Sequence, residues 1–212
     1  MGTMYWAAFV AACIGSLTVT PFSIWLAKRW GVLDVPSARK IHTVPIPRWG
    51  GLGLYAGIAL GVLGLYAGFP RFRALLDFRH SVYDQGRLLG IIALDKQLAG
   101  ILVGLTAVLI LGMMDDKRGV SALPKLLTQI IASLLAFNYG VQITGFRVPF
   151  VNLYVDFPIL VSQIVTGFWV IGFMNALNLA DGLDGLATGI AAIASGTFVA
   201  VAIIQSNTEA VF

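Results

Sequence analysis

The sequence predicts an all-α membrane protein that crosses the bilayer several times. Of its 212 residues, 58% are hydrophobic and only 11% are charged, whereas charged residues make up about 25% of an ordinary soluble domain. Long apolar segments recur along the chain, and most of the basic residues lie in the stretches between them. Such segments approach or cross a hydrocarbon core about 30 Å thick. We therefore expect a single transmembrane domain over residues 1–212 and no soluble domain.

Six apolar segments are candidate transmembrane helices. They are Met4–Ala27, Leu52–Phe69, Gln97–Met114, Leu123–Tyr139, Phe157–Asn175 and Leu186–Gln205. A further apolar run, Leu88–Leu94, either lengthens the third span or lies at the membrane interface. The stretch from Gly140 to Pro158 alternates Val, Phe and Tyr around glycine and proline, which favours a small outer β-hairpin.

The distribution of basic residues predicts the orientation in the membrane. The connections after spans one, three and five share one side and hold eight Lys and Arg residues, counting Lys125, against six in the connections after spans two and four. Because Lys and Arg are enriched in cytoplasmic loops, we place the first set in the cytoplasm and the N-terminus outside. The net charge of +4 comes from these scattered residues, so we expect no nucleic-acid partner.

A polar cluster at Asn175–Ala187 joins the last two predicted spans. Its amides and carboxylates, at Asn175, Asn178, Asp181 and Asp184, recur at every third position. The glycines among them predict a helix end, a tight loop and a new helix start, because glycine allows a sharp backbone turn. Oxygen ligands gathered in this way suit a hard cation such as Mg²⁺.

Span three ends in a second acidic motif, the doublet Asp115–Asp116. Two adjacent carboxylates repel each other, so keeping both ionised calls for a cation or basic neighbours. Two interpretations stay open at equal weight: a metal or diphosphate–metal complex, or a solvated helix end paired with Lys117 and Arg118.

The first loop, Asp34–Gly51, contains three prolines and a glycine pair, which predict an extended and fairly rigid conformation. Its cations Arg39, Lys40 and Arg48 either hold phosphate oxygens or only fix the orientation of the chain. Lys125, at the start of span four, similarly reaches a phosphate or extends to the interface. All three motifs fall on the predicted cytoplasmic side. Together they describe a site where a phosphorylated soluble donor meets a lipid-borne acceptor.

Three ordered motifs resemble those of the polyprenyl-phosphate N-acetylhexosamine-1-phosphate transferases of bacterial envelope synthesis. They are Asp34–His42 with Pro47–Gly51, Asp115–Asp116 with Gly119 and Lys125, and Asn175–Ala187. The first loop resembles the undecaprenyl-phosphate N-acetylglucosamine-1-phosphate transferase branch more than the phospho-N-acetylmuramoyl-pentapeptide branch. Family members continue with further spans, a Gly-Asp-x-Gly loop and a His-rich loop. The resemblance therefore implies the N-terminal part of a longer multi-span enzyme, and we expect this part alone to be inactive.

The resemblance implies transfer of a sugar-1-phosphate, most simply N-acetylglucosamine-1-phosphate, from a UDP-N-acetylhexosamine to polyprenyl phosphate, with release of UMP. It also implies a multi-pass protein of the bacterial cytoplasmic membrane, in contact with membrane lipid, active on its cytoplasmic face and compatible with a homodimer. Mg²⁺, with Mn²⁺ as a substitute, is the implied cofactor.

The resemblance also assigns roles to individual residues. Asn178 and Asp181 would hold the metal. Asp115 and Asp116 would orient or deprotonate the acceptor phosphate or support the metal, and Asp184 would order the loop or the nucleotide. The implied substrate-binding residues are Lys125, Arg39, Lys40 and Asn175.

Two other functions are weighed against this one. An ion-coupled secondary transporter also uses intramembrane Asp and Asn with glycine breaks, but it predicts acids near the midplane and access from both sides. An intramembrane prenyltransferase also pairs Asp-rich motifs with Mg²⁺ and diphosphate, yet it typically lacks the basic proline-rich loop. Metal dependence is common to the prenyltransferase and the leading hypothesis, so it does not separate them.

Overall fold

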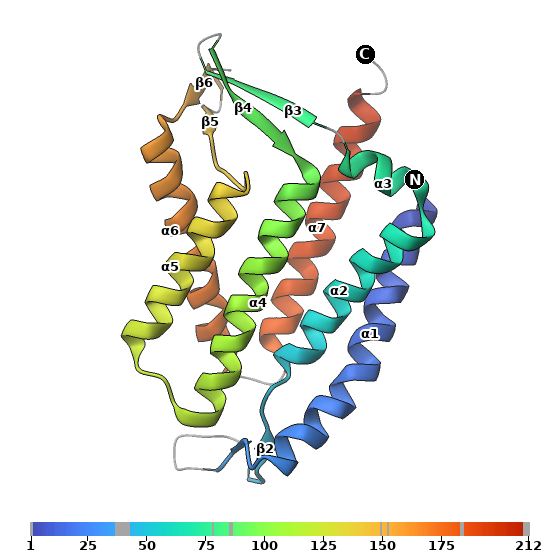
Figure 1. Cartoon of the computed structure of the whole chain (residues 1–212), viewed down its shortest axis with the longest axis vertical. Helices are drawn as coiled ribbons and strands as arrows, with labels where there is room; N and C mark the ends of the chain where they lie inside the picture. The colour runs from blue at the N-terminus through green and yellow to red at the C-terminus, as the bar shows by residue number, and fades with distance from the viewer. Residues whose placement is uncertain are drawn as a thin grey trace. The chain divides into compact units, whose positions relative to one another are not determined.

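The computed structural model describes residues 2–36, 43–77, 79–84, 87–148, 150–151, 153–182 and 185–209. These residues are mostly helical (Figure 1). The helices are α1 (Gly2–Arg29), α2 (Gly51–Gly68), α3 (Pro70–Leu76), α4 (Leu94–Arg118), α5 (Ala122–Asn138), α6 (Ile159–Ala180) and α7 (Leu186–Glu209).

Each of the six predicted spans coincides with a helix. Among the described residues, α1, α2, α4 and α6 are long and apolar enough to cross a membrane, while α5 and part of α7 (Leu186–Val201) are shorter apolar helices. A bilayer offers the backbone no hydrogen-bond partners, which is why apolar segments of this length fold as helices. The structure therefore agrees with a mostly helical membrane protein, and the number of crossings stays a prediction.

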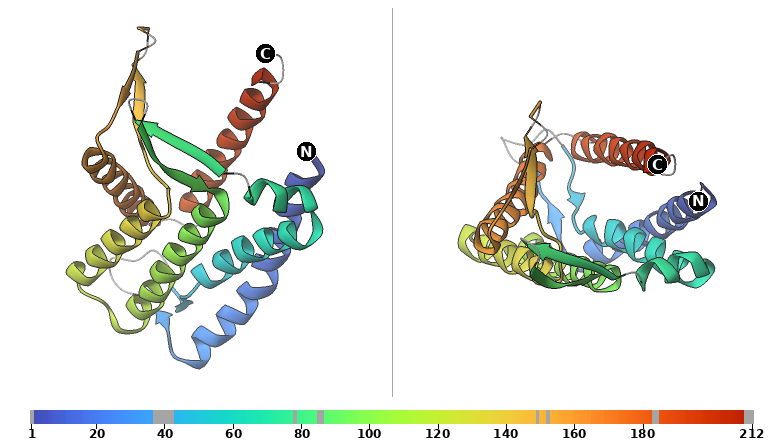
Figure 2. Two further views of the ribbon diagram at one scale, coloured as in Figure 1. Left: turned by 45° about the horizontal axis from the view of Figure 1, so that its top comes forward. Right: turned by 90° about the horizontal axis from the view of Figure 1, so that it is seen from above.

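The chain forms two compact units, residues 1–167 and 168–212, whose boundary falls inside α6. In the first unit α1 packs against α2, α2 against α4, and α4 against α5, so helices that follow one another lie side by side (Figure 2). The second unit contains the rest of α6 and α7.

Close contact between α1 and α2 depends on small residues on both helices. A carbon added at Gly57 would lie 2.9 Å from the carbonyl oxygen of Ala12, which is closer than real side chains come. Small residues let helix backbones approach in this way, and packing of this kind drives helix association in membranes. The buried glycines of α2 are Gly53, Gly57 and Gly61, and the facing residues of α1 include Ala12, Ser16 and Thr20.

In the described part of the chain, three antiparallel strand pairs lie between helices. β1 (Leu33–Asp34) pairs with β2 (Ile46–Pro47), β3 (Arg79–Asp84) with β4 (Arg87–Ala93), and β5 (Gly145–Val148) with β6 (Leu153–Asp156). The last pair lies in the stretch for which a small hairpin is predicted.

The strand β4 corrects one prediction. Most of the apolar run Leu88–Leu94 belongs to this strand, and α4 begins only at Leu94, so the run does not lengthen the third span. A short apolar run fits a strand as well as a helix, which is why periodicity alone leaves it ambiguous.

Polar contacts fix the end of the first unit that lies away from the acidic doublet. The amide of Gln97 near the start of α4 donates to the carbonyl of Gly140 after α5, at 2.7 Å. Ser162 of α6 donates to the carbonyl of Ile143 at 2.7 Å, and the Ile143 N–H donates to Thr166 at 2.9 Å. These bonds tie the starts of α4 and α6 to the segment that follows α5.

We predict that Gly57→Leu destabilises the first unit, because the new side chain must displace the backbone of α1. Overpacking of this kind costs about 1–3 kcal/mol. The matched control is Gly68→Leu, since a carbon added at Gly68 meets nothing within 4 Å. Thermal unfolding in detergent, followed by tryptophan fluorescence, measures both. Equal unfolding midpoints for the two variants would contradict this account of the α1–α2 contact.

Candidate active site

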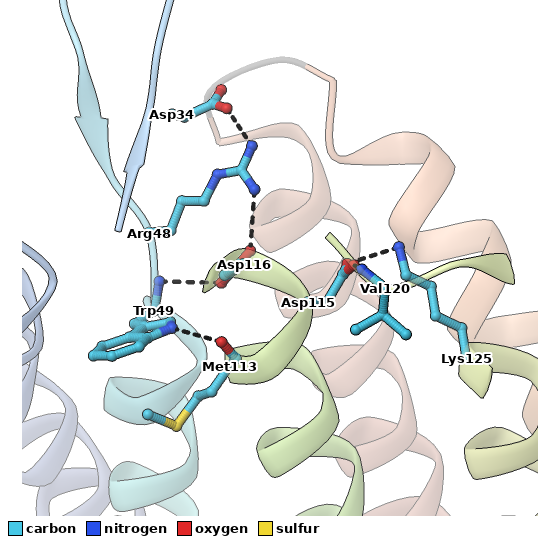
Figure 3. Close-up of polar contacts among 8 residues, drawn as sticks. All are labelled: Asp34, Arg48, Trp49, Met113, Asp115, Asp116, Val120 and Lys125. Carbon is cyan, nitrogen blue, oxygen red and sulfur yellow. Dashed lines mark hydrogen bonds and ion pairs between the residues drawn. The ribbon is translucent and has the colours of Figure 1, made fainter. Parts of the chain in front are cut away.

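The acidic doublet lies in the last turn of α4, and its two carboxylates point to different partners (Figure 3). Consecutive residues of an α-helix are rotated by about 100° about its axis. Asp115 therefore faces the turn that leads into α5, while Asp116 faces the loop between α1 and α2. Each of the two acids therefore has its own basic partner, Lys125 for Asp115 and Arg48 for Asp116.

Asp115 organises the turn between α4 and α5. One of its oxygens accepts from the Lys125 ammonium at 2.7 Å, and the other accepts from the Val120 N–H at 2.8 Å. Gly119 ends α4 with a φ of +64°, the left-handed conformation that glycine adopts readily after a helix. The Asp115 carboxylate thus connects the end of one helix to the start of the next.

Asp116 contacts two adjacent residues of the first loop. The Arg48 guanidinium lies 3.7 Å from Oδ1 of Asp116, and the backbone N–H of Trp49 donates to Oδ2 at 3.3 Å. Arg48 is also hydrogen-bonded and ion-paired with Asp34. The result is a chain of carboxylate, guanidinium and carboxylate that joins the end of α1 to the end of α4.

The charges around Arg48 favour its ionised form. The hydrogen bond to Asp34 raises the pKa of Arg48 above its ordinary value, and the negative charges of Asp34, Asp116 and Asp115 add to this, whereas burial acts in the opposite direction. An arginine is already protonated at any physiological pH. Arg48 is therefore a permanent cation between the two acids.

Trp49 anchors the loop. Its side chain is 4% exposed and packs with Ala27 and Val32, and its indole N–H donates to the carbonyl of Met113 in α4 at 3.1 Å. The Trp49 backbone has a φ of +72°, a conformation that costs a residue other than glycine about 1–3 kcal/mol. The buried ring and its hydrogen bond offset this cost.

The pairing of β1 with β2 brings Asp34 and Arg48 together. Asp34 lies opposite Ile46 in this register, and the Arg48 N–H donates to the carbonyl of Val32 at 3.1 Å. The two ends of the first loop are thereby joined just before α2 begins. The local sequence does not reveal this contact, because the two partners are 14 positions apart along the chain.

The Asn/Asp cluster belongs to the second unit. Asn175 and Asn178 lie in the unbroken helix α6, Asp181 follows its end, and Gly185 has a φ of +81° just before α7 begins. The predicted helix end and new helix start are confirmed, while residues 183 and 184 of the predicted tight loop lie outside the described residues. Residues three apart lie on the same side of a helix, so the Asn178 and Asp181 positions adjoin.

Several predicted site residues meet in the structure, and others lie outside the described residues. Asp115 contacts Lys125, and Asp116 contacts the first loop. Arg39, Lys40 and Asp184 belong to the part of the chain that the structure does not describe. Asn175 donates to the carbonyl of Ile171 within its own helix at 2.8 Å.

One interpretation of the doublet needs correction. Its basic partners are Arg48 and Lys125 rather than the neighbouring Lys117 and Arg118. The Lys117 ammonium instead lies 4.4 Å from the ring centre of Trp30. Neighbouring residues of a helix point in different directions around its axis. Proximity in sequence therefore does not make Lys117 a partner of Asp116.

Asp34 and Trp49 are the contributors that the sequence analysis did not single out. The available signal was an acid before the prolines of the first loop and a large aromatic residue directly before its glycine pair. An aromatic residue in a polar loop is a candidate anchor, but its left-handed backbone cannot be read from the sequence.

Comparison with known proteins decides the family. Residues 98–212 match the model of glycosyl transferase family 4, and these residues make up more than half of the chain. The chain belongs to glycosyl transferase family 4. The matched part includes the acidic doublet, Lys125 and the Asn/Asp cluster, whereas the first loop lies before it.

Two of the curated relatives of this family 4 chain are named for a polyprenyl phosphate. It is 31% identical over 196 residues to a probable undecaprenyl-phosphate N-acetylglucosaminyl 1-phosphate transferase of Bacillus subtilis, covering 92% of the chain and 48% of that protein. A decaprenyl-phosphate N-acetylglucosaminephosphotransferase of Mycolicibacterium smegmatis is 32% identical over 169 residues, which cover 79% of the chain and 37% of that protein.

A relative from the other branch matches less of the chain. A phospho-N-acetylmuramoyl-pentapeptide-transferase of Lactobacillus helveticus is 36% identical over 131 residues, covering 54% of the chain and 38% of that protein. The family 4 chain spans about half the length, or less, of these relatives. No solved structure matches it.

We predict that Asp115→Ala destabilises the chain more than Lys125→Met does. The alanine variant loses the bond to the Val120 N–H as well as the ion pair, at a cost of about 1–3 kcal/mol. The methionine variant loses only a partly exposed ion pair, which contributes at most about 1 kcal/mol. Denaturant titration in detergent micelles compares their free energies of unfolding. The reverse order would mean that the ion pair, not the turn, is the main contribution of Asp115.

Proposed function

We propose that the gene product containing this chain transfers N-acetylglucosamine-1-phosphate from UDP-N-acetylglucosamine to polyprenyl phosphate in the synthesis of envelope polysaccharide. The observation that carries this proposal is the acidic doublet at the end of an apolar helix, with Arg48 and Lys125 as its cations, in a chain of glycosyl transferase family 4. The choice of sugar is supported by the N-acetylglucosamine relatives, which match a larger share of the chain than the pentapeptide relative does.

The reaction moves a phosphoryl group between two anions. An oxygen of polyprenyl phosphate attacks the phosphorus that carries the sugar, the bond from that phosphorus to UMP breaks, and a lipid-linked diphosphate sugar forms. Phosphoryl transfer needs positioning and charge neutralisation more than covalent help from the protein. The lipid tail of the acceptor lies among apolar helices, so its phosphate reaches the membrane boundary, where a helix such as α4 ends.

Individual residues have the following proposed roles. Asp116 orients the acceptor phosphate or accepts its proton, and Asp115 holds Lys125 near the phosphates. Lys125 neutralises phosphate charge. Arg39 and Lys40 extend this neutralisation from the first loop, while Asn175 and Asp184 contact the substrate or order the loop around the nucleotide.

We propose Asn178 and Asp181 as protein ligands of Mg²⁺, with Mn²⁺ as a substitute. Among the described residues no group of three or more His, Cys, Asp or Glu could hold a metal. Mg²⁺ usually binds one or two carboxylates together with waters and substrate phosphates, so one amide and one carboxylate, both exposed at the end of α6, fit this ion. When bound, Mg²⁺ neutralises the donor diphosphate.

The active face is proposed to be cytoplasmic, in a multi-pass protein of the bacterial inner membrane. The larger share of Lys and Arg in the connections predicted after spans one, three and five, counted with the basic last turns of α1 and α4 and with Lys125 of α5, supports this orientation. It also gives the enzyme access to a soluble nucleotide sugar. A homodimer is compatible with this arrangement.

We predict that Asp116→Asn and Asp181→Asn each lower kcat/KM for UMP release by about 100-fold or more, the effect of losing one electrostatic contribution to a transition state. The assay uses the gene product containing this chain, reconstituted with polyprenyl phosphate, Mg²⁺ and UDP-N-acetylglucosamine. Asp77→Asn, a change in an acid just after α3, should keep parental activity. A parent protein that forms a lipid-linked product only from the UDP-muramoyl pentapeptide would overturn the choice of sugar.

We predict that the first loop and the β5–β6 turn lie on opposite sides of the membrane. Cys13 is the only cysteine of the chain, so a Cys13→Ala background allows single cysteines at Val44 and Phe150, which are 64% and 107% exposed. In intact cells whose periplasm is accessible, an impermeant maleimide should label Phe150→Cys at once. Val44→Cys should be labelled only after permeabilisation. The opposite pattern would place the doublet outside.

A further inference from the structure

We propose that Arg48 and Trp49 are positioning residues that fix the Asp116 carboxylate for phosphoryl transfer, and that Asp34 in turn fixes Arg48. The catalytic part of this proposal, that the oriented Asp116 carboxylate acts in phosphoryl transfer, rests on the proposed function. The contacts themselves are a property of the first unit alone, so they can be tested whether or not the transfer reaction takes place. We call these three residues, with Asp116, the loop clasp.

The two oxygens of Asp116 are contacted by neighbouring residues of one loop. Arg48 lies beside Oδ1 at 3.7 Å, and the Trp49 N–H donates to Oδ2 at 3.3 Å. A carboxylate with both oxygens engaged has a defined orientation, since rotation about its side-chain bonds would break one contact or the other. Catalytic groups need such orientation, because a displacement of about 1 Å can lower a rate by about 100-fold.

The backbone of Trp49 indicates why a tryptophan occupies this position. Its φ of +72° lies in the region that glycine occupies most easily, and Gly50 and Gly51 follow directly. The buried indole ring compensates, because it donates to the Met113 carbonyl at 3.1 Å. The Trp49 ring also packs edge-to-face with the Trp30 ring, with ring centres 5.7 Å apart. The ring holds the backbone in the conformation that aims its N–H at Asp116.

Arg48 suits its place because its planar guanidinium has several donors in a fixed fork. One terminal nitrogen contacts Asp34, and the other lies beside Asp116. A lysine would carry the same charge but concentrate it on one nitrogen. The side chain of Asp34 is 22% exposed, and its place on β1 is set by the pairing with β2. Asp34 therefore holds the guanidinium from the side opposite Asp116.

The first test measures hydrogen exchange by mass spectrometry on the purified 212-residue chain in detergent. In Arg48→Ala and in Trp49→Phe, we expect exchange to rise at least threefold both in residues 46–52 and in residues 112–120, since the clasp joins these segments. Lys28→Gln, which changes an exposed cation at the end of α1, is the control and should leave both segments unchanged. Unchanged exchange in both clasp variants would overturn the proposal.

The second test separates positioning from folding. In the gene product containing this chain, Arg48→Lys and Trp49→Phe should lower kcat by about 10- to 100-fold while KM for UDP-N-acetylglucosamine changes less than threefold and the unfolding midpoint stays near that of the parent. A variant with parental kcat, or one whose loss of activity only follows its loss of folded protein, overturns the positioning role. An inactive parent refutes the proposed function, while the exchange measurement still decides whether the clasp exists.

Discussion

The contact between Arg48 and Asp116 is the interaction on which the site in the first unit depends. It joins a loop that follows α1 to the end of α4, although Trp49 and Asp116 are 67 positions apart along the chain. At a membrane boundary an unpaired carboxylate is costly, whereas a carboxylate beside a permanent cation can stay ionised. The cation in turn needs a second acid to hold it in place, and Asp34 supplies this. The cation that favours ionised Asp116 and the contacts that orient its carboxylate therefore belong to the same small cluster.

The packing of α1 against α2 explains how the loop clasp can hold the end of α4 in a defined position. α1 and α2 approach closely along a face of small residues, which leaves little freedom for the two helices to slide. The first loop starts at the end of one of them and finishes at the beginning of the other. The strand pair and the buried Trp49 of this loop are therefore attached to two closely packed helices, and Asp116 contacts the loop that they hold in place.

Hydropathy was enough to predict the helices, because in a bilayer an apolar segment has no alternative to satisfying its own backbone. It could not predict that residues 87–93 form a strand, since the six apolar and small residues from 88 to 93 fit either structure. The end of α6 and the start of α7 on either side of the Asn/Asp cluster's glycines were predictable from glycine spacing. The partners of the doublet were not, because Arg48 comes from a distant loop and nothing in the local sequence distinguishes it from Lys117 or Arg118. The role of Trp49 depends on a backbone angle that sequence patterns do not report.

The orientation of Asp115 and Asp116 also limits how this protein can change. Each residue added to α4 would rotate its end by about 100° and move it by about 1.5 Å, which would turn both carboxylates away from their loops. The start of the helix is held as well, through Gln97 and Gly140. The number of residues between Gln97 and Asp115 is therefore constrained. For this helix, an insertion or deletion displaces both carboxylates at once, whereas a substitution changes one position.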